Sequence, residues 1–344
     1  MNEITRILLS DMPLAISETG YRYLLATAYP KTFDTLLTDI PLHKPTHGDF
    51  VSTTPLYGAA ATIPSHGAAA TVPGDFVAGH PYAAATHSHL RTLAAQTKDI
   101  PLTDDFTSES TPDNTIAYHR IFGPILADAY WHFSSKRFEQ DLIAAEENPQ
   151  IIAHLLHVNS PGGEAYYLDR LGETMDNCQK PIIAIIEEAC SAAYNIACHA
   201  QAIYATTQFD LVGCIGTMVS FYDYSEFYAK MGIKRIEAKA DKSDLKNATV
   251  EELIDGKPKK FIQQVLNPMN ESFLSTVRSH RSALAKAPDD SPALRGETFF
   301  TDEALSIGLI DGRLTFADAA AEAHRRGTAW RNTARLATQL YKLE

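Results

Sequence analysis

Hydrophobic residues follow two periodicities in the part of the chain after residue 115. Unbroken apolar runs at 151–158 and 182–186 are typical of strands that are buried on both faces. Apolar residues recur every three to four positions over 133–146 and 164–177, which predicts amphipathic helices there. Because strands alternate with helices, we expect βαβ units with a parallel sheet, and therefore an α/β fold.

Less regular patterns predict the remaining elements of this region. A polar turn at 210–216 precedes an apolar stretch at 217–221, where we expect a strand. The other expected strands cover 116–123 and 202–205, and the other expected helices cover 191–202, 225–231, 258–285 and 302–306.

Composition divides the chain into four parts. Residues 1–41 have apolar positions at roughly helical spacing and are expected to form a short ordered segment. Residues 42–114 are rich in Ala, Thr, Gly, Pro and His and contain short repeats, which indicates a low-complexity linker or insert. The globular pattern spans 115–327, and 328–344 is expected to form a helical tail.

Overall composition restricts the class of protein. The chain has 344 residues, 45% of them hydrophobic and 21% charged, as in soluble globular proteins. Its formal net charge of −12 argues against nucleic-acid binding, which requires clustered positive charge. No apolar run is long enough to predict a membrane span. The four cysteines include no C-x-x-C pair, so we expect reduced cysteines in a cytoplasmic protein.

The segments after the two buried strands carry the candidate chemistry. Asn159–Gly163 ends in two glycines after the first strand, and Ser191 stands among small residues after the second. A serine at the start of a helix lies beside N–H groups that have no acceptor in the helix. Such a serine is commonly only a helix cap, but beside a Gly-Gly turn it can also be the nucleophile of acyl transfer.

A serine nucleophile needs a base, and the sequence leaves its identity open. His154, His157 and His199 lie in strand or helix positions that favour structural roles. The histidines of residues 42–114 follow no metal-binding spacing, and we expect no metal ion. A lysine in an apolar environment loses its proton more easily and can act as the base. The charged segment 237–247 offers three lysines, although it can equally be a solvated loop.

Four motifs together resemble the signal peptide peptidase A family, including its phage branch, the head-maturation proteases. The motifs are NSPGG at 159–163, CSAAY at 190–194, GCIG at 213–216 and FFTDEALSIGLID at 299–311. They stand in the family's order, and the resemblance covers about 115–325. It implies the ClpP/crotonase-like superfold, with repeated ββα units, a helical cover and assembly into homo-oligomeric rings.

The resemblance implies roles for individual residues near the glycines and the serine. Ser191 would be the nucleophile of a Ser-Lys dyad that hydrolyses peptide bonds. The backbone N–H of Gly162 would form the oxyanion hole, assisted by Gly163 or Ala192. No metal or organic cofactor would be required.

The base is assigned by its distance along the chain. The family's lysine lies a little over fifty residues after the serine; Lys242 lies 51 residues and Lys246 55 residues after Ser191. Lys242 is preferred, with Lys246 as the rival and Lys239 third. Cys214 stands where the family usually has a serine that orients the lysine, and a thiol is a weaker hydrogen-bond partner.

The expected function is therefore that of a serine endopeptidase. Without a predicted membrane anchor, a phage or prophage capsid-maturation protease that acts on capsid or scaffold proteins inside the procapsid is favoured. A cytosolic bacterial peptidase of the signal-peptide-peptidase type is the close alternative. Two further interpretations are an acyl-CoA enzyme of the same superfold, using Glu187 or Glu188, and a non-catalytic assembly protein.

Overall fold

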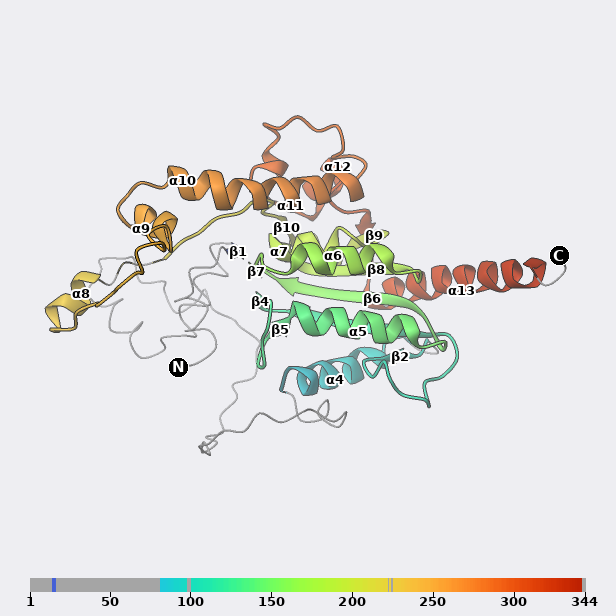
Figure 1. Ribbon diagram of the computed structural model, residues 1–344. Helices are drawn as coiled ribbons and strands as arrows, with labels where there is room; N and C mark the ends of the chain where they lie inside the picture. Colours follow the sequence, from blue (N-terminus) through green and yellow to red (C-terminus); the bar gives the residue numbers. More distant parts are fainter. Residues whose placement is uncertain (1–13, 17–80, 98–99, 222, 224, 342–344) are drawn as a thin grey trace, which may run out of the picture.

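A computed structural model describes residues 14–16, 81–97, 100–221, 223 and 225–341. Most of the predicted N-terminal segment 1–41, and residues 42–80 of the predicted insert, lie outside the described residues. The described fold therefore comprises mainly the chain from residue 81 onward (Figure 1).

A mostly parallel sheet forms the centre of the molecule. Its strand order is β11-β10-β8-β6-β3-β2, and every neighbouring pair is parallel except β10 and β11. These strands are β11 (Thr298–Phe300), β10 (Leu211–Gly213), β8 (Ile182–Cys190), β6 (Ile151–Ser160), β3 (Thr115–Phe122) and β2 (Leu102–Thr103). β9 (Ala202–Ala205) pairs with the first half of β8 and with β12 (Gly312–Arg313). The predicted α/β fold class is confirmed.

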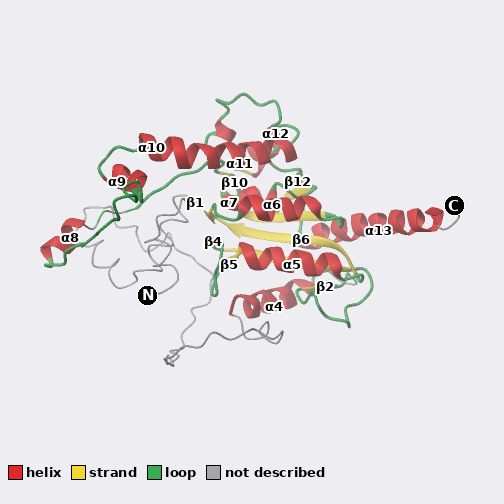
Figure 2. Ribbon diagram, in the orientation of Figure 1, coloured by secondary structure: helices red, strands yellow, loops and turns green. Residues whose placement is uncertain are grey.

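Helices cover both faces of this sheet (Figure 2). One face packs against α5 (Ser135–Glu147), α6 (Leu168–Asn177), α7 (Ala192–Ala197) and α11 (Asn267–His280). The other face packs against α4 (Pro81–Ala94) and α13 (Phe316–Tyr341). Alternate residues of β6 and β8 enter the two cores, which explains why the sequence of these strands is apolar on both faces.

A second, smaller sheet lies at the end of β6. Its strand order is β1-β7-β4-β5, with β1 (Leu14–Ile16), β7 (Gly162–Glu164), β4 (Ile125–Leu126) and β5 (Phe133–Ser134). β7 pairs with β1 on one side and with β4 on the other. The segment from the N-terminal region therefore contacts the glycine turn that the sequence assigns to the site.

The predicted low-complexity insert includes a helix that packs on the sheet. In α4, Leu90 and Leu93 are buried against Tyr118 of β3 and other residues of the core. The Tyr82 hydroxyl donates to the Arg120 carbonyl at 2.6 Å. Composition hides this helix because its many Ala and Thr residues surround only a few large apolar ones.

The prediction of a strand at 217–221 is wrong. The strand is β10, which ends at Gly213, and the positive φ angles of Gly213 and Cys214 (117° and 52°) then turn the chain out of the sheet. The helix expected over 191–202 is also shorter, since α7 ends at Ala197. The predicted C-terminal tail is part of one continuous helix, α13.

Between β10 and α10, the chain runs through an exposed segment, residues 225–257, which we call the arm. It carries α8 (Ser225–Lys230) and α9 (Ala248–Ile254), and neither helix has a buried residue. Figure 1 shows both helices to one side of the sheet. The chain returns through α10 (Lys259–Phe261) and a π-helical turn (Ile262–Leu266) into α11. After a 3₁₀ turn (Pro292–Leu294) and β11, α12 (Thr301–Ile307) leads to β12.

Candidate active site

The predicted site residues meet where the parallel strands β6, β8 and β10 end. Ser160 of β6 pairs with Ala189 of β8, so Gly162 and Ser191 each lie two residues beyond this pair. On the other side of β8, Gly213 pairs with Cys190. The carboxyl edge of a parallel sheet is where α/β proteins place their sites, and here it brings together Gly162, Ser191 and the turn at Cys214.

Ser191 has a backbone conformation that is costly for a residue with a side chain. Its φ and ψ are 55° and −120°, outside the helical and extended regions. Two hydrogen bonds hold it there: its N–H donates to the Gly213 carbonyl at 2.8 Å, and its carbonyl accepts the Asn195 N–H at 2.9 Å. Strained residues of this kind cluster at functional sites, and a strand-turn-helix serine is the geometry of a nucleophile elbow.

The alternative role of Ser191 as an ordinary helix cap does not fit the structure. Its side chain makes no capping hydrogen bond, and its φ is not that of a cap residue. The residue is 1% exposed. The Ser191 hydroxyl is thus left available at the start of α7.

Two backbone N–H groups belong to residues at the same edge of the sheet as Ser191. Ala192 is the first residue of α7, so its N–H has no acceptor within the helix. Gly162 has a φ of 101°, and its N–H donates to the Ser160 hydroxyl at 3.1 Å. An oxyanion is a stronger acceptor than a hydroxyl and would compete for the Gly162 N–H. Nothing in the sequence pointed to Ser160, because a hydroxyl two residues before a glycine has no distinctive pattern.

Gly163 has a structural reason to be glycine. A Cβ at this position would lie 2.0 Å from the carbonyl oxygen of Ile125 in β4, which pairs with β7. The absence of a side chain therefore allows the small sheet to close beside the site.

Cys214 directly follows Gly213, whose carbonyl accepts the Ser191 N–H. Burial raises the pKa of the Cys214 thiol, and the neighbouring Glu188 carboxylate raises it further. The thiol is therefore protonated near neutral pH, which suits a hydrogen-bond donor and disfavours a nucleophile. Burial also raises the pKa of Glu188.

The histidines near the strands have other partners. His154 Nε2 lies 2.8 Å from Glu146, and His157 Nε2 lies 3.1 Å from Glu187. Glu187 also accepts the side-chain N–H of Asn159, so the carboxylate considered for acyl-CoA chemistry is already held. None of these histidines contacts Ser191 among the described residues.

Comparison with known proteins relates this chain to a peptidase family. Residues 175–329 match the model of Peptidase family S49. The match contains Ser191, Cys214 and the three candidate lysines, and it begins after the glycine turn.

Two curated proteins agree with this S49 match. A candidate protease of Methanocaldococcus jannaschii is 28% identical over 178 residues, which are 48% of this chain and 53% of that protein. A candidate signal peptide peptidase, SppA, of Enterococcus faecium is 24% identical over 189 residues, 52% of each protein. The chain spans about half the length of these relatives. Together with the family match they support an S49 peptidase.

Similar solved structures include two proteases. One is a lysine-to-alanine variant of the 1510-N membrane-bound stomatin-specific protease with a substrate peptide, at 14% identity and a TM-score of 0.39, covering 61% of this chain and 80% of that one. The other is a ClpP1 variant from Listeria monocytogenes, at 12% identity and a TM-score of 0.35, covering 59% and 94%. An enoyl-CoA hydratase/isomerase family member has a TM-score of 0.28 at 14% identity, covering 60% and 65%.

Among the described residues, none of the three candidate lysines forms a hydrogen bond or ion pair with Ser191. Lys242 and Lys246 are exposed on the arm. Lys239 Nζ forms ion pairs with Glu251 at 2.6 Å and Glu237 at 3.4 Å, and these carboxylates raise its pKa. A charged, paired lysine cannot accept a proton, so Lys239 is the poorest of the three candidates.

A small cavity opens next to the site residues. It has a volume of about 40 Å³ and lies between the start of α6, α7 and α11. Asn195, one turn after Ser191, lines it together with Ala165 and Thr217.

In the described residues, no helix is long and apolar enough to cross a membrane.

Proposed function

We propose that the protein is a serine endopeptidase in which Ser191 attacks the peptide carbonyl. The observation that carries this proposal is the strained, uncapped Ser191 at a strand-to-helix turn, beside the N–H of Ala192, which has no acceptor within its helix. Burial of an uncapped hydroxyl at a strained position costs stability, and acyl transfer gives a reason for it.

We propose further that Lys242, from a neighbouring copy of the chain, is the base. Within one chain the arm holds Lys242 in solvent, away from the serine that it would deprotonate. The arm also exposes large apolar side chains: Ile236 is 93% and Leu245 75% exposed. Exposed apolar segments mark association surfaces, and a second copy that covered the arm would remove the lysine amine from water. Lys246 is the alternative base.

The mechanism then follows from the groups present. The neutral lysine amine takes the Ser191 proton as Oγ bonds to the carbonyl carbon, and the N–H groups of Ala192 and Gly162 stabilise the oxyanion. The lysine returns the proton to the leaving amine, which leaves an acyl-enzyme. Water, deprotonated by the same amine, hydrolyses the ester.

A fluorophosphonate probe tests the nucleophile. We expect wild-type protein to be labelled and Ser191→Ala to lose labelling with an unchanged circular dichroism spectrum. Ser135→Ala is the matched control, because Ser135 is another buried serine, with a hydroxyl that has no hydrogen-bond partner among the described residues. Labelling that persists in Ser191→Ala, or that disappears in Ser135→Ala, would contradict the proposal.

The biological role proposed is maturation of a phage or prophage capsid within a ring-shaped assembly. The support is the resemblance of the motifs to head-maturation proteases. Incubation with capsid or scaffold proteins and, separately, with signal peptides distinguishes this role from that of a cellular signal-peptide peptidase. Selective cleavage of signal peptides would overturn the capsid role while leaving the serine endopeptidase intact.

A further inference from the structure

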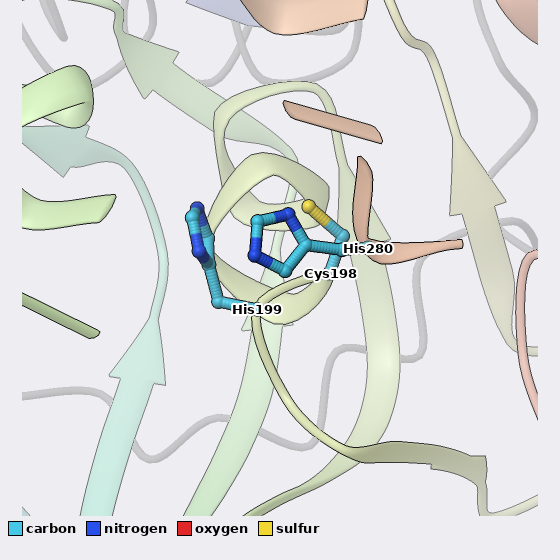
Figure 3. Close-up of side chains that lie close together, drawn as sticks. All are labelled: Cys198, His199 and His280. Carbon is cyan, nitrogen blue, oxygen red and sulfur yellow. The ribbon is translucent and has the colours of Figure 1, made fainter. Parts of the chain in front are cut away.

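Three potential metal ligands lie together behind the proposed nucleophile helix. Cys198 and His199 follow the last residue of α7, and His280 is the last residue of α11. Ligand atoms of the three side chains lie within 4.8 Å of one another. The two imidazole ring centres are 4.2 Å apart, with the Cys198 sulfur beside them (Figure 3).

A carboxylate from a third helix contacts both imidazoles. Asp176 Oδ1 lies 2.7 Å from His199 Nδ1 and 2.8 Å from His280 Nε2. Three side chains of the types that bind zinc therefore have ligand atoms close to one another, and Asp176 of α6 contacts the two imidazoles among them. They are separated in sequence by up to 104 residues, which explains why no spacing motif indicated them.

The hydrogen bonds of His280 are compatible with a cation at this place. Nδ1 lies 2.8 Å from the Thr276 carbonyl oxygen and 3.0 Å from the Ser279 hydroxyl, and Nε2 faces the Asp176 carboxylate. With a metal ion on Nε2, Nδ1–H would donate to Thr276, as the second nitrogen of a metal-bound histidine usually does.

Gly172 provides the space for the His199 ring. A Cβ on Gly172 would lie 2.9 Å from His199 Cε1 and Nε2. Glycine inside a helix costs about 1 kcal/mol relative to alanine. The close approach of the His199 imidazole to α6 gives a reason for this cost.

We propose that Cys198, His199, His280 and Asp176 bind a structural zinc ion. The Cys198 thiol, which now donates to the Asn195 carbonyl at 3.1 Å, releases its proton on binding. A thiolate, a carboxylate and two neutral imidazoles give a formal charge of −2, which Zn²⁺ neutralises. Charge neutrality matters because Cys198 is fully buried and His199 nearly so.

A second cluster of similar composition does not fit a metal ion. Ligand atoms of Glu146, His154 and Cys178 are also close together. Both nitrogens of His154 are already used, by His119 at 3.0 Å and Glu146 at 2.8 Å. The buried ammonium group of Lys180 contributes positive charge at the same place, which disfavours a cation.

The zinc ion would join α11 to α7 and α6. α11 follows the arm after α10 and the π-helical turn, and the ion would fix its last residue, His280, against the residues that follow α7. The inference does not depend on peptidase activity, since it concerns metal content and stability.

Metal content of the full chain tests the proposal. After treatment with a chelator, addition of zinc and dialysis, we expect about one zinc ion per chain by elemental analysis. Cobalt(II) in place of zinc should give a thiolate-to-metal charge-transfer band and the intense visible absorption of a tetrahedral site. Excess zinc should raise the melting temperature of the chelated protein, because the metal binds the folded state.

Variants assign the ligands. Cys198→Ala should lose the charge-transfer band, and His280→Gln should lose stoichiometric zinc and the rise in melting temperature. His280 is partly exposed, so this variant tests the site even if Cys198→Ala fails to fold. Cys178→Ala, from the second cluster, is the matched control and should bind zinc like the wild type.

Two results would overturn the zinc site. One is weak, substoichiometric binding that is equal in the wild type and all variants, which would mean an adventitious ion only. The other is a charge-transfer band that persists in folded Cys198→Ala. Either result would leave Asp176, His199 and His280 as a hydrogen-bonded network without a metal ion.

Discussion

Ser191 adopts a backbone conformation that its neighbours impose. The Gly213 carbonyl and the Asn195 N–H fix its two peptide groups, and a φ of 55° costs about 1–3 kcal/mol for a residue with a Cβ. Small residues around Ser191 made a tight turn foreseeable. The strain itself was not, because it depends on β10, which contacts this turn only in the folded sheet.

Replacement of Ser191 by glycine and by alanine separates strain from chemistry. Ser191→Gly should be about 1 kcal/mol more stable to unfolding than Ser191→Ala, since glycine tolerates this φ while alanine does not. Both should lack fluorophosphonate labelling. Urea denaturation measures the difference, and an alanine variant as stable as the glycine variant would show that the turn is not strained.

Asp141 of α5 couples stability to pH. Its pKa is raised to about 7, chiefly by burial; Arg137 opposes the rise and Asp104 contributes to it. The unfolded chain loses this proton near pH 4, so between about pH 4 and 7 the folded state binds more protons and stability falls as pH rises. Asp141→Asn should flatten this decline and add about 1 kcal/mol at pH 8.

The control for this prediction is Glu147→Gln at the exposed end of the same helix. Unfolding is followed in urea at pH 4, 6 and 8. An equal pH dependence of stability in wild-type and Asp141→Asn protein would contradict the raised pKa of Asp141.

At the scale of elements, long periodic segments were predictable and short ones were not. β6, β8, α5 and α6 follow from the sequence because their apolar residues face cores on one or both sides. α4 was missed because only a few large side chains, among them Tyr82, Leu90 and Leu93, pack it against the rest of the fold. The strand was predicted too late in the sequence, because β10 has only three residues and the turn after it depends on two positive φ angles.

The contribution of α4 can be measured with one substitution. Leu90→Ala should destabilise the protein by about 2–4 kcal/mol, because it leaves a cavity against Tyr118 and α13. Leu336→Ala on α13 is the matched control, since Leu336 is 60% exposed and should change stability by less than about 0.5 kcal/mol. Equal effects of the two substitutions would mean that α4 does not pack on the sheet in solution.

At the scale of the whole molecule, the candidate site divides into two parts. The serine and its N–H donors follow from strand order, because parallel strands bring their carboxyl ends to one edge. The lysine does not follow from this order, since it lies on an arm with exposed helices α8 and α9. Distance along the sequence selects Lys242 and Lys246 as candidates without locating either amine. Under the proposed arrangement, the position of the base depends on how the copies assemble.

Mixing two inactive variants determines whether the base comes from a neighbouring copy. Ser191→Ala keeps the lysine and Lys242→Ala keeps the serine. If each site combines a serine with a neighbour's lysine, assemblies formed from equal amounts should regain about a quarter of the wild-type activity, since each site needs one intact partner of each kind. Peptide hydrolysis before and after mixing measures the recovery, and each variant mixed with itself is the control. If serine and lysine acted within one chain, no mixture could regain activity, whereas full activity of Lys242→Ala alone would transfer the role to Lys246.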